Sequence, residues 1–365
     1  TYLSVAGSMA ISLTAFAAQP PKMKMTTDIP PGIATPEKLE TRLGTLTSVD
    51  GVPDAATAQK VYDNLDFQRA VQAYLNSIQI ASMNGMREGI LKWGPANYTA
   101  LLFEELMDST TLFLTPNTVS IYQLLWLDLM EGPMVMETPP NGIGLVDDAW
   151  FHYVADFGQV GPDKNKGGKY LFLPPGYKGD IPDGYFVKKT QTYGNWVIWR
   201  GAQVNGSTAP AINATKEKLR VYPLAKKDNP PKMTFINVTG KPFNTIHTMD
   251  SHFFEEVNAV VQREPGEGQD PEILGQLASI GIKKGQPFKP DARMQKILAE
   301  AADVAAVTVR TLASRPREDM FYYYPGKGVW TTPFPGGSYL FLDKNNARYL
   351  DARAYFHFYA TGITP

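Results

Sequence analysis

The feature that most constrains this chain is a series of short apolar runs separated by turn signals between residues 111 and 203. The runs have the length of β-strands, and Gly, Pro, Asn and Asp gather between them, as in PPNG at 139–142 and PPG at 174–176. Such spacing is typical of a β-sandwich or a β-barrel. The predicted strands cover residues 119–128, 133–138, 150–157, 170–173, 185–189 and 196–203.

Helical patterns lie on both sides of this region. Apolar residues recur at helical spacing over residues 55–83, and Pro95 suits the first turn of a second helix over residues 96–107. Further helices are predicted over 252–263, 271–280 and 291–313. From Met320 the aromatic, turn-rich pattern returns, and residues 351–361 are predicted to form a strand. We therefore expect a mainly β protein with α insertions.

These patterns divide the chain into five segments. We expect a leader over residues 1–17, an arm or linker over 18–54, and a helical entry with a first β-sandwich domain over 55–250. A helical insertion follows over 251–319, and a second β-sandwich domain begins at 320. Because the β pattern is still running at Pro365, we expect this second domain to be incomplete.

The first residues resemble a signal peptide. Residues 3–18 are apolar or small and uncharged, and Ala15-Phe16-Ala17 offers the small residues that a signal peptidase requires. An apolar N-terminal strand is the alternative. Neither an initiator Met nor a basic segment precedes the run, so we expect the leader to be partial. Because a signal peptide directs export, we expect a periplasmic or secreted protein. No later run reaches the roughly 20 apolar residues of a membrane span, so no transmembrane anchor is expected.

Composition and missing motifs exclude several kinds of site. The chain has 0 Cys, which removes thiolate nucleophiles, Cys-ligated zinc and iron–sulfur clusters. A net charge of −1 provides no general attraction for nucleic acid. The G-x-S-x-G and S-x-x-K nucleophile motifs are absent, as are phosphate loops and dinucleotide fingerprints, so we predict no cofactor.

The densest group of titratable side chains lies between His247 and Glu256. His247 and Asp250 could act as a carboxylate–His pair in general base catalysis, with Arg200 binding the substrate. We predict no metal site, because His247 and His252 are five residues apart, whereas paired helical His ligands are four apart. The alternative is that Asp250 or Ser251 caps the following helix.

A second candidate is the strand that runs from Asn117 to Asp128. Alternation places Tyr122, Trp126 and Asp128 on one face, together with Ser120 and Leu124. Such a face suits a sugar or another polar ring, so we assign Asn117, Tyr122, Trp126 and Asp128 to a ligand site. The alternative is an ordinary half-solvated face whose Asp128 enters a turn.

Arg200 closes an aromatic strand. A buried Arg stays charged and needs a partner, which could be a bidentate ligand carboxylate or a structural pair with Asp128 or Asp156. We include Arg200 and Tyr222 among the candidate ligand residues, because Tyr also suits carbohydrate stacking. For Tyr222 the alternative is sheet packing with its hydroxyl at the rim.

Several segments, taken in order, resemble a known bacterial family. They are TPNT at 115–118 with Tyr122, DL-x-x-GP-x-V at 128–135, LPPGYKG at 173–179, WVIWRG at 196–201, RVYPL at 220–224 and FFEEVN at 253–258. From about residue 67 onward the chain is similar to proteins that join domain of unknown function 1254 to a C-terminal domain of unknown function 1214, and the resemblance leads us to expect that the second domain is truncated here. This resemblance implies interlinked antiparallel, jelly-roll-like β-sandwich domains with helical insertions, and export, but no agreed activity.

The chain departs from that family at one motif. Members often carry Asn-Asn-Asp-Thr-x-Tyr where this chain has NTVSIY at 117–122. Any role of the family's Asp is therefore missing here.

Three functions remain open from the sequence. The first is an exported protein that binds a small polar or carbohydrate-like ligand through Arg200 and Asp128. The second is a hydrolase or lyase that acts on an extracellular ester or polymer with His247, Asp250 and Arg200. The third is an envelope-associated interaction module, whose sheet edges and Pro-rich arm mediate homo-oligomerisation.

Overall fold

The computed structural model describes residues 27–113 and 116–361, with side chains to residue 358. The predicted leader over residues 1–17 lies outside the described residues. The chain divides into two compact units, one ending at Val61 and the other beginning at Tyr62.

The first unit contains a small antiparallel sheet where the sequence led us to expect an arm or linker. It comprises η1 (Pro31–Ile33), β1 (Lys38–Thr41), β2 (Gly44–Val49) and β3 (Val52–Pro53), with β2 between β1 and β3. Helix α1 (Ala55–Leu91) follows directly, and the Asp54 carboxylate accepts a hydrogen bond of 2.7 Å from the Thr57 backbone N–H. This side chain caps the first turn of α1.

The second unit is built around two sheets. The six-stranded sheet has the order β14 (Thr234–Asn237), β4 (Thr99–Leu102), β6 (Ile121–Asp128), β12 (Gly194–Gly201), β8 (Gly142–Asp148), β9 (Tyr153–Gly158). The four-stranded sheet has the order β11 (Phe186–Lys189), β10 (Lys169–Leu173), β7 (Met134–Glu137), β13 (Arg220–Pro223). Strand β14 runs parallel to β4 and β11 runs parallel to β10, while the other pairs are antiparallel. Neither sheet is closed.

One hydrophobic core lies between these two sheets. Val197 and Trp199 of β12 contact the same cluster as Phe172 of β10 and Met136 of β7. Helix α2 (Ala209–Lys218) adds Ile212 to this cluster. Because side chains alternate along a strand, residues 196, 198 and 200 of β12 face away from this core.

The opposite face of the six-stranded sheet meets the end of α1. Met83, Met86 and Ile90 of α1 share a cluster with Leu124 and Trp126 of β6. A short parallel pair, β5 (Thr111–Leu112) with β15 (Phe243–Asn244), lies at the same side and adds Phe243 to the cluster. The apolar residues on both faces of β6 explain why seven of its eight residues are buried.

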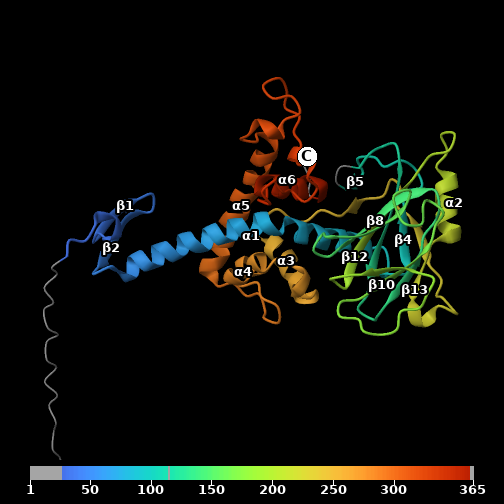
Figure 1. Ribbon diagram of the computed structural model, residues 1–365, viewed down its shortest axis with the longest axis horizontal. Helices are drawn as coiled ribbons and strands as arrows, with labels where there is room; N and C mark the ends of the chain where they lie inside the picture. The colour runs from blue at the N-terminus through green and yellow to red at the C-terminus, as the bar shows by residue number, and fades with distance from the viewer. Residues whose placement is uncertain (1–26, 114–115, 362–365) are drawn as a thin grey trace, which may run out of the picture. The chain divides into compact units, whose positions relative to one another are not determined.

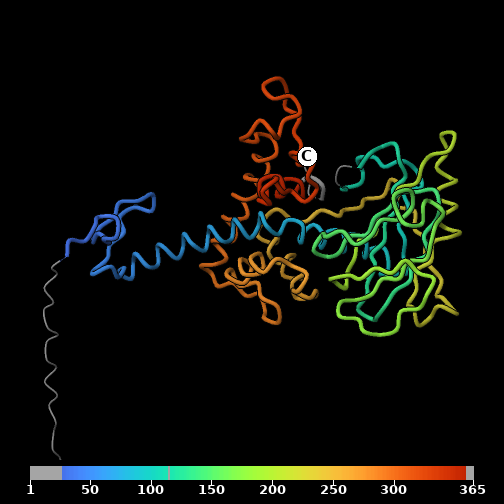
Figure 2. The backbone as a smooth tube through the Cα atoms, in the orientation of Figure 1, coloured from blue at the N-terminus to red at the C-terminus, as the bar shows by residue number. Residues whose placement is uncertain are grey.

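The remaining helices gather around α1 in a second core (Figures 1 and 2). Tyr74 of α1 stacks on Phe253 with ring centroids 3.8 Å apart. The core takes its residues from α1, α3 (His252–Arg263), α4 (Pro271–Ser279), α5 (Ala292–Ser314) and α6 (Leu350–Thr361). Short 3-10 turns connect these parts: η2 (Leu224–Lys226), η3 (Gly266–Gly268), η4 (Asp319–Phe321) and η5 (Pro335–Gly337). Over the described part of the chain, no helix is both long and apolar enough to cross a membrane.

Most of the predicted elements are confirmed. Strands β6, β7, β9, β10, β11 and β12 overlap the predicted runs, with ends that differ by up to three residues, and α3, α4 and α5 match the three later predicted helices. A β-rich fold with helices is therefore correct, while the two β-sandwich domains and their boundaries stay predictions.

Two predicted elements are wrong. The helix over 96–107 is instead β4, whose four residues are all buried, so that the strand shows no alternating pattern. The strand over 351–361 is instead α6, where Ala352, Tyr355 and Phe358 lie one helical turn apart and are buried. Strand β8 was missed, because its small and acidic residues lack a clear apolar run.

Candidate functional site

A cavity opens on the face of the six-stranded sheet that points away from the inter-sheet core. Its volume is about 260 Å³, and Arg200 stands at its edge. Arg200 pairs in register with Tyr122 of β6 on one side and with Ile143 of β8 on the other, so three neighbouring strands supply this part of the wall. The cavity is lined by Phe113, Tyr122, Ile143, Gly144, Leu145, Asp156, Val160, Trp196, Ile198, Trp199 and Arg200.

Arg200 has no ionic partner among the residues that the structure describes. Its side chain forms no ion pair and no hydrogen bond with any residue that the structure describes, although it is half-buried. Its guanidinium carbon lies 6.0 Å from the centre of the Tyr122 ring, a weak cation–π contact. Since a guanidinium stays charged and has five N–H donors, this side chain is available to an external anion.

The wall beside Arg200 is aromatic and apolar. The Phe113 ring lies 5.9 Å from the Tyr122 ring and 6.4 Å from the Trp196 ring, between centroids. Ile198 and Leu145, which pair in register, also line the cavity. An apolar group entering the cavity would therefore be surrounded by apolar side chains.

Two carboxyl groups lie on the β8–β9 side. Asp156 lines the cavity, and the Tyr153 hydroxyl donates a hydrogen bond of 3.2 Å to it. Asp147 lies on the same face of β8 as Ile143 and Leu145. Burial, together with the charges of Asp148 and Asp156, raises the pKa of Asp147 to about 8. Asp147 is therefore mainly protonated at neutral pH.

A wider groove of about 830 Å³ adjoins the cavity and shares Arg200 and Ile143 with it. Apolar atoms make up the larger part of its surface, as in the cavity, but several uncharged polar side chains also line it: Asn117, Ser120, Asn141, Gln159, Asn165 and Gln203. Amide side chains are thus present on the groove side of Arg200 and absent from the cavity lining.

Three of the predicted site residues come together here. Asn117, Tyr122 and Arg200 all line the cavity or the groove. Asn117 donates two hydrogen bonds to the Tyr122 hydroxyl, of 3.1 Å from its backbone N–H and 3.2 Å from its side chain. The Asn117 side-chain oxygen accepts from Ser120 as well, and these contacts fix the loop that leads into β6.

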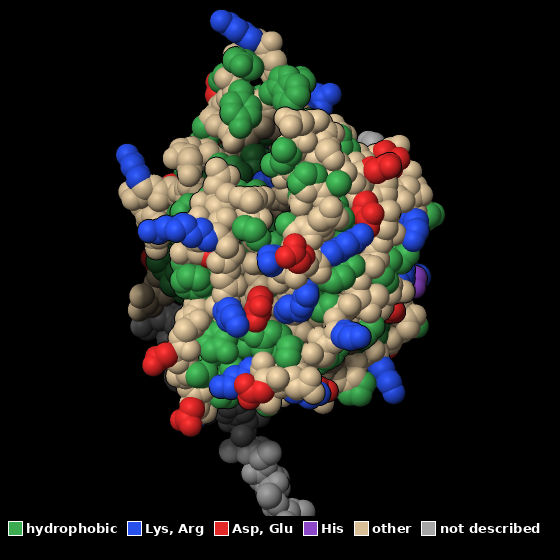
Figure 3. Space-filling model, turned by 90° about the vertical axis from the view of Figure 1, so that its right-hand side faces the viewer, with side chains coloured by type: hydrophobic (Ala, Val, Ile, Leu, Met, Phe, Trp, Pro, Cys, Tyr) green, Lys and Arg blue, Asp and Glu red, His purple; other side chains and the backbone are tan. Residues whose placement is uncertain are grey.

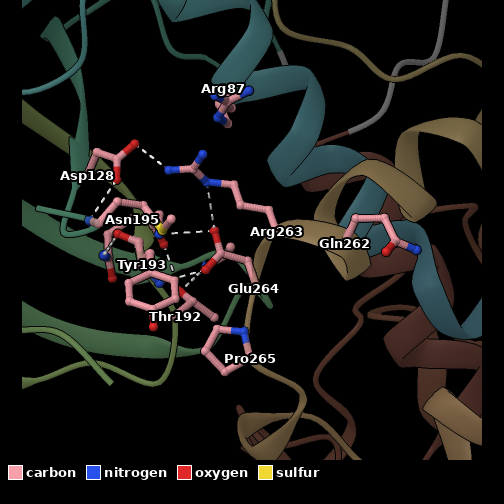
Figure 4. A network of polar contacts seen from close by, with 12 residues as sticks. Arg87, Asp128, Thr192, Tyr193, Asn195, Gln262, Arg263, Glu264 and Pro265 are labelled. Carbon is pink, nitrogen blue, oxygen red and sulfur yellow. Dashed lines mark hydrogen bonds and ion pairs between the residues drawn. The ribbon is translucent and has the colours of Figure 1, made fainter. Parts of the chain in front are cut away.

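Asp128 lies elsewhere, in a network at the other end of β6 (Figure 4). The Arg263 guanidinium at the end of α3 forms an ion pair with Asp128, and its Nε lies 3.2 Å from the Glu264 carboxylate. Glu264, with a side chain only 1% exposed, accepts hydrogen bonds of 2.6 and 3.1 Å from the backbone N–H groups of Tyr193 and Gly194. This network ties α3 to the sheet. Trp126 lies beside it in the core.

His247 is buried in the helical part. It is 2% exposed, and its ring lies 5.4 Å from the Phe253 ring, between centroids. Its Nδ1 lies 2.6 Å from the Thr248 carbonyl oxygen, and burial lowers its pKa to about 4. Gly85 of α1 makes room for this segment, since a Cβ there would lie 2.6 Å from the Thr245 carbonyl oxygen.

Asp250 lies one residue before Ser251, the N-cap of α3, whose own side chain forms no capping hydrogen bond. The Asp250 carboxylate accepts a hydrogen bond of 2.9 Å from the backbone N–H of His252, the first residue of α3. Neither Asp250 nor His247 lines the cavity or the groove that contains Arg200.

Tyr222 belongs to the four-stranded sheet. It packs with Val135 and Leu171, and its hydroxyl donates a hydrogen bond of 2.7 Å to Glu137. It does not line the cavity.

Several residues of the site do not stand out in the sequence as ligand residues. Ile143 of β8, and Asp156 of β9, which was considered only as a structural partner of Arg200, reach the site through strand pairing with segments far away in the sequence. Trp196 lies on β12 itself, close to Arg200 in the sequence. The alternation of β12 placed Trp196 on the face of Arg200, and this signal could have identified it. No group of three or more His, Cys, Asp or Glu side chains suited to a metal ion occurs among the described residues.

Two comparisons with known proteins show similarity to this chain. Residues 99–223 match the model of a family described as "Protein of unknown function (DUF1254)". A crystal structure of the VPA0106 protein from Vibrio parahaemolyticus is similar to this chain, with a TM-score of 0.51 and 18% sequence identity. That match covers 70% of this chain and 62% of the Vibrio chain, so this chain spans less than two thirds of that protein. No curated protein matches.

At 18% identity, the Vibrio structure shows a similar fold and no more. The family match runs from the first residue of β4 to the last residue of β13. The part of the chain that resembles the family described as a protein of unknown function therefore contains Arg200, Tyr122 and every other residue that lines the cavity.

Proposed function

We propose that this chain binds a small organic acid, whose carboxylate pairs with Arg200 and whose apolar part enters the cavity beside Trp196. The observation that carries the proposal is a half-buried guanidinium without an ionic partner in the described protein, next to an apolar cavity. Arg pairs with carboxylates through two parallel hydrogen bonds, which give orientation as well as affinity. A few polar groups within an apolar pocket are the usual composition of a small-molecule site.

The size of the cavity limits the ligand. At about 260 Å³ it falls just below the roughly 300–1,000 Å³ of sites for drug-sized molecules, so one ring or a short branched chain fills it. Asp156 provides an acceptor for a hydroxyl or amine on that ring.

Binding is preferred to the catalytic alternative because of where the side chains lie. Arg200 lines the cavity, whereas His247 and Asp250 line neither the cavity nor the adjoining groove. A hydrolase or lyase that uses these three residues together would need them within hydrogen-bond reach of one substrate.

Calorimetric titration with a matched pair of probes tests the proposal. Phenylacetate carries a ring and a carboxylate, and phenylacetamide is its neutral counterpart. We expect phenylacetate to bind at least about tenfold more tightly. Arg200→Met should abolish that difference, and Arg200→Lys should restore part of it, since Lys keeps the charge without the planar fork. Arg315→Gln, at an exposed Arg that ends α5, is the control. Equal affinities of both probes for the wild-type protein would exclude the proposal.

We also propose a fold class, a second-domain likeness and a localisation for this chain. We infer from the core shared by the two sheets that they form a β-sandwich. The motifs after residue 250 suggest a likeness to domain of unknown function 1214. Export to the periplasm or the medium is inferred from the leader, and fractionation of cells that express the gene from its own start would test it.

A further inference from the structure

The cavity and the groove meet at Arg200, and the boundary between them is chemical as well as geometric. On the cavity side, Arg200 is followed by Ile198 and Trp196 along the same face of β12. On the groove side it is followed by loop residues with amide side chains. A ligand held at Arg200 can therefore extend in two directions into two different environments.

The groove has unused hydrogen-bonding capacity. The side chains of Asn141 and Gln159 form no hydrogen bonds with other described residues, and the side-chain nitrogen of Asn165 donates none while its oxygen accepts from Gly142. Gln203 donates to the Val119 carbonyl oxygen, which leaves its own oxygen as an acceptor. Amides present donors and acceptors side by side, and so do hydroxyl groups on a sugar ring.

Among the described residues that line the cavity and the groove, no other cation is found beside Arg200. Arg200 is the sole charged residue among those that line the groove, and Asp156 is the other charged residue of the cavity. On the face shown in Figure 3, basic and acidic side chains are intermingled with apolar and neutral ones rather than forming a patch of one sign. A single carboxylate is therefore better suited to this site than a phosphate or a polyanion.

We propose that the ligand is a uronic acid that carries an apolar substituent: the substituent occupies the cavity, the carboxylate pairs with Arg200, and the ring hydroxyls contact the groove amides. This inference rests on the proposed function, because it requires carboxylate binding at Arg200. The new part of the inference is the sugar ring, which is inferred from the groove and not from the cavity.

Phenyl β-D-glucuronide is a probe with all three parts, and three relatives each lack one. Phenylacetate lacks the sugar, phenyl β-D-glucoside lacks the carboxylate, and D-glucuronate lacks the apolar group. In calorimetric titrations of the whole chain we expect phenyl β-D-glucuronide to bind at least about tenfold more tightly than each of the three. Hippurate, which replaces the hydroxyls by an amide, should bind no better than phenylacetate.

The outcomes separate the two proposals. If phenylacetate binds through Arg200 but the glucuronide is no tighter, the sugar inference is wrong and the proposed function stands. If the glucoside binds as tightly as the glucuronide, the role of the carboxylate is wrong. If none of the probes binds, both proposals fall.

A groove variant provides an independent readout. Gln159→Leu should weaken phenyl β-D-glucuronide several-fold and leave phenylacetate unchanged, because Gln159 lines the groove and not the cavity. Gln286→Leu, at an exposed Gln in the helical part, is the matched control. An equal loss for both probes in Gln159→Leu would contradict the division into an apolar and a sugar compartment.

Discussion

Arg200 and Tyr122 are register partners on β12 and β6, and the guanidinium carbon lies 6.0 Å from the centre of the phenol ring. The same Tyr122 hydroxyl accepts two hydrogen bonds from Asn117. One aromatic side chain thus contacts the cation of the site and fixes the loop at its entrance.

Tyr122→Phe should loosen this loop and keep the ring beside Arg200. Loss of the acceptor for Asn117 should lower the free energy of unfolding by about 0.5–1.5 kcal/mol, the usual net value of a hydrogen bond. Hydrogen exchange at the Asn117 amide should become faster. Tyr153→Phe, which removes an exposed hydroxyl bonded to Asp156, is the control. Unchanged exchange at Asn117 would show that the hydroxyl does not fix the loop.

Glu264→Ala should destabilise the junction between α3 and the sheet. The substitution leaves the N–H groups of Tyr193 and Gly194 without their acceptor and removes one carboxylate from Arg263. Removing one partner of a buried ion pair typically costs about 3–5 kcal/mol. Urea unfolding measures this loss, and Glu267→Ala, three residues further on and exposed, should cost far less. Similar losses in the two variants would contradict this role of Glu264.

Asp147→Asn should change how stability depends on pH. The pKa of Asp147 is about 8 in the folded protein, well above its ordinary value of 3.8, so the unfolded chain releases this proton at lower pH. Its contribution to stability is complete below about pH 4 and is lost as the pH rises towards 8, at no more than about 1.4 kcal/mol per pH unit.

The Asp147→Asn variant has no titrating group at this position, so it does not lose this stability as the pH rises. Melting temperatures of Asp147→Asn and wild type should therefore agree near pH 4, and the variant should be the more stable near pH 8. Asp183→Asn, at an exposed Asp, is the control. A difference between Asp147→Asn and wild type that does not grow with pH would exclude a raised pKa.

Gly158→Ala should be strongly destabilising, and Gly176→Ala only mildly so. Both glycines have positive φ, of 77° and 71°. A Cβ at Gly158 would lie 2.1 Å from the Gly142 carbonyl oxygen, whereas nothing lies within 4 Å of one at Gly176. We expect about 1–2 kcal/mol for the backbone conformation in both variants and more for Gly158→Ala because β8 and β9 must separate. Thermal unfolding measures both, and equal losses would contradict the clash.

Local sequence signals were sufficient for many elements of the fold. The helices α3, α4 and α5 have apolar residues at helical spacing, and Asp270 and Asp291 accept hydrogen bonds from the first turns of α4 and α5. Local sequence signals failed at β4, which is buried on both faces, and at α6, whose dense aromatic residues resemble those of a strand.

The candidate site was predictable in part. Alternation along β6 placed Tyr122 on the candidate ligand face, and Arg200 was singled out because it closes an aromatic strand. Alternation also grouped Asp128 with Tyr122, because residues of the same parity share a face. The two are six positions apart, however, and at the far end of β6 the Arg263 side chain forms an ion pair with Asp128.

The sequence by itself determined a cysteine-free, β-rich chain with helical segments and a charged residue closing an aromatic strand. Hydrophobic periodicity is a pattern over a few neighbouring residues. It is therefore enough to predict a helix or strand and to assign residues to its two faces. The order of strands in the sheet, the register that sets Arg200 between Tyr122 and Ile143, and the burial of His247 away from them were decided by tertiary structure alone. These relationships join residues that are far apart in the chain, and no local pattern records which distant strand will supply a partner.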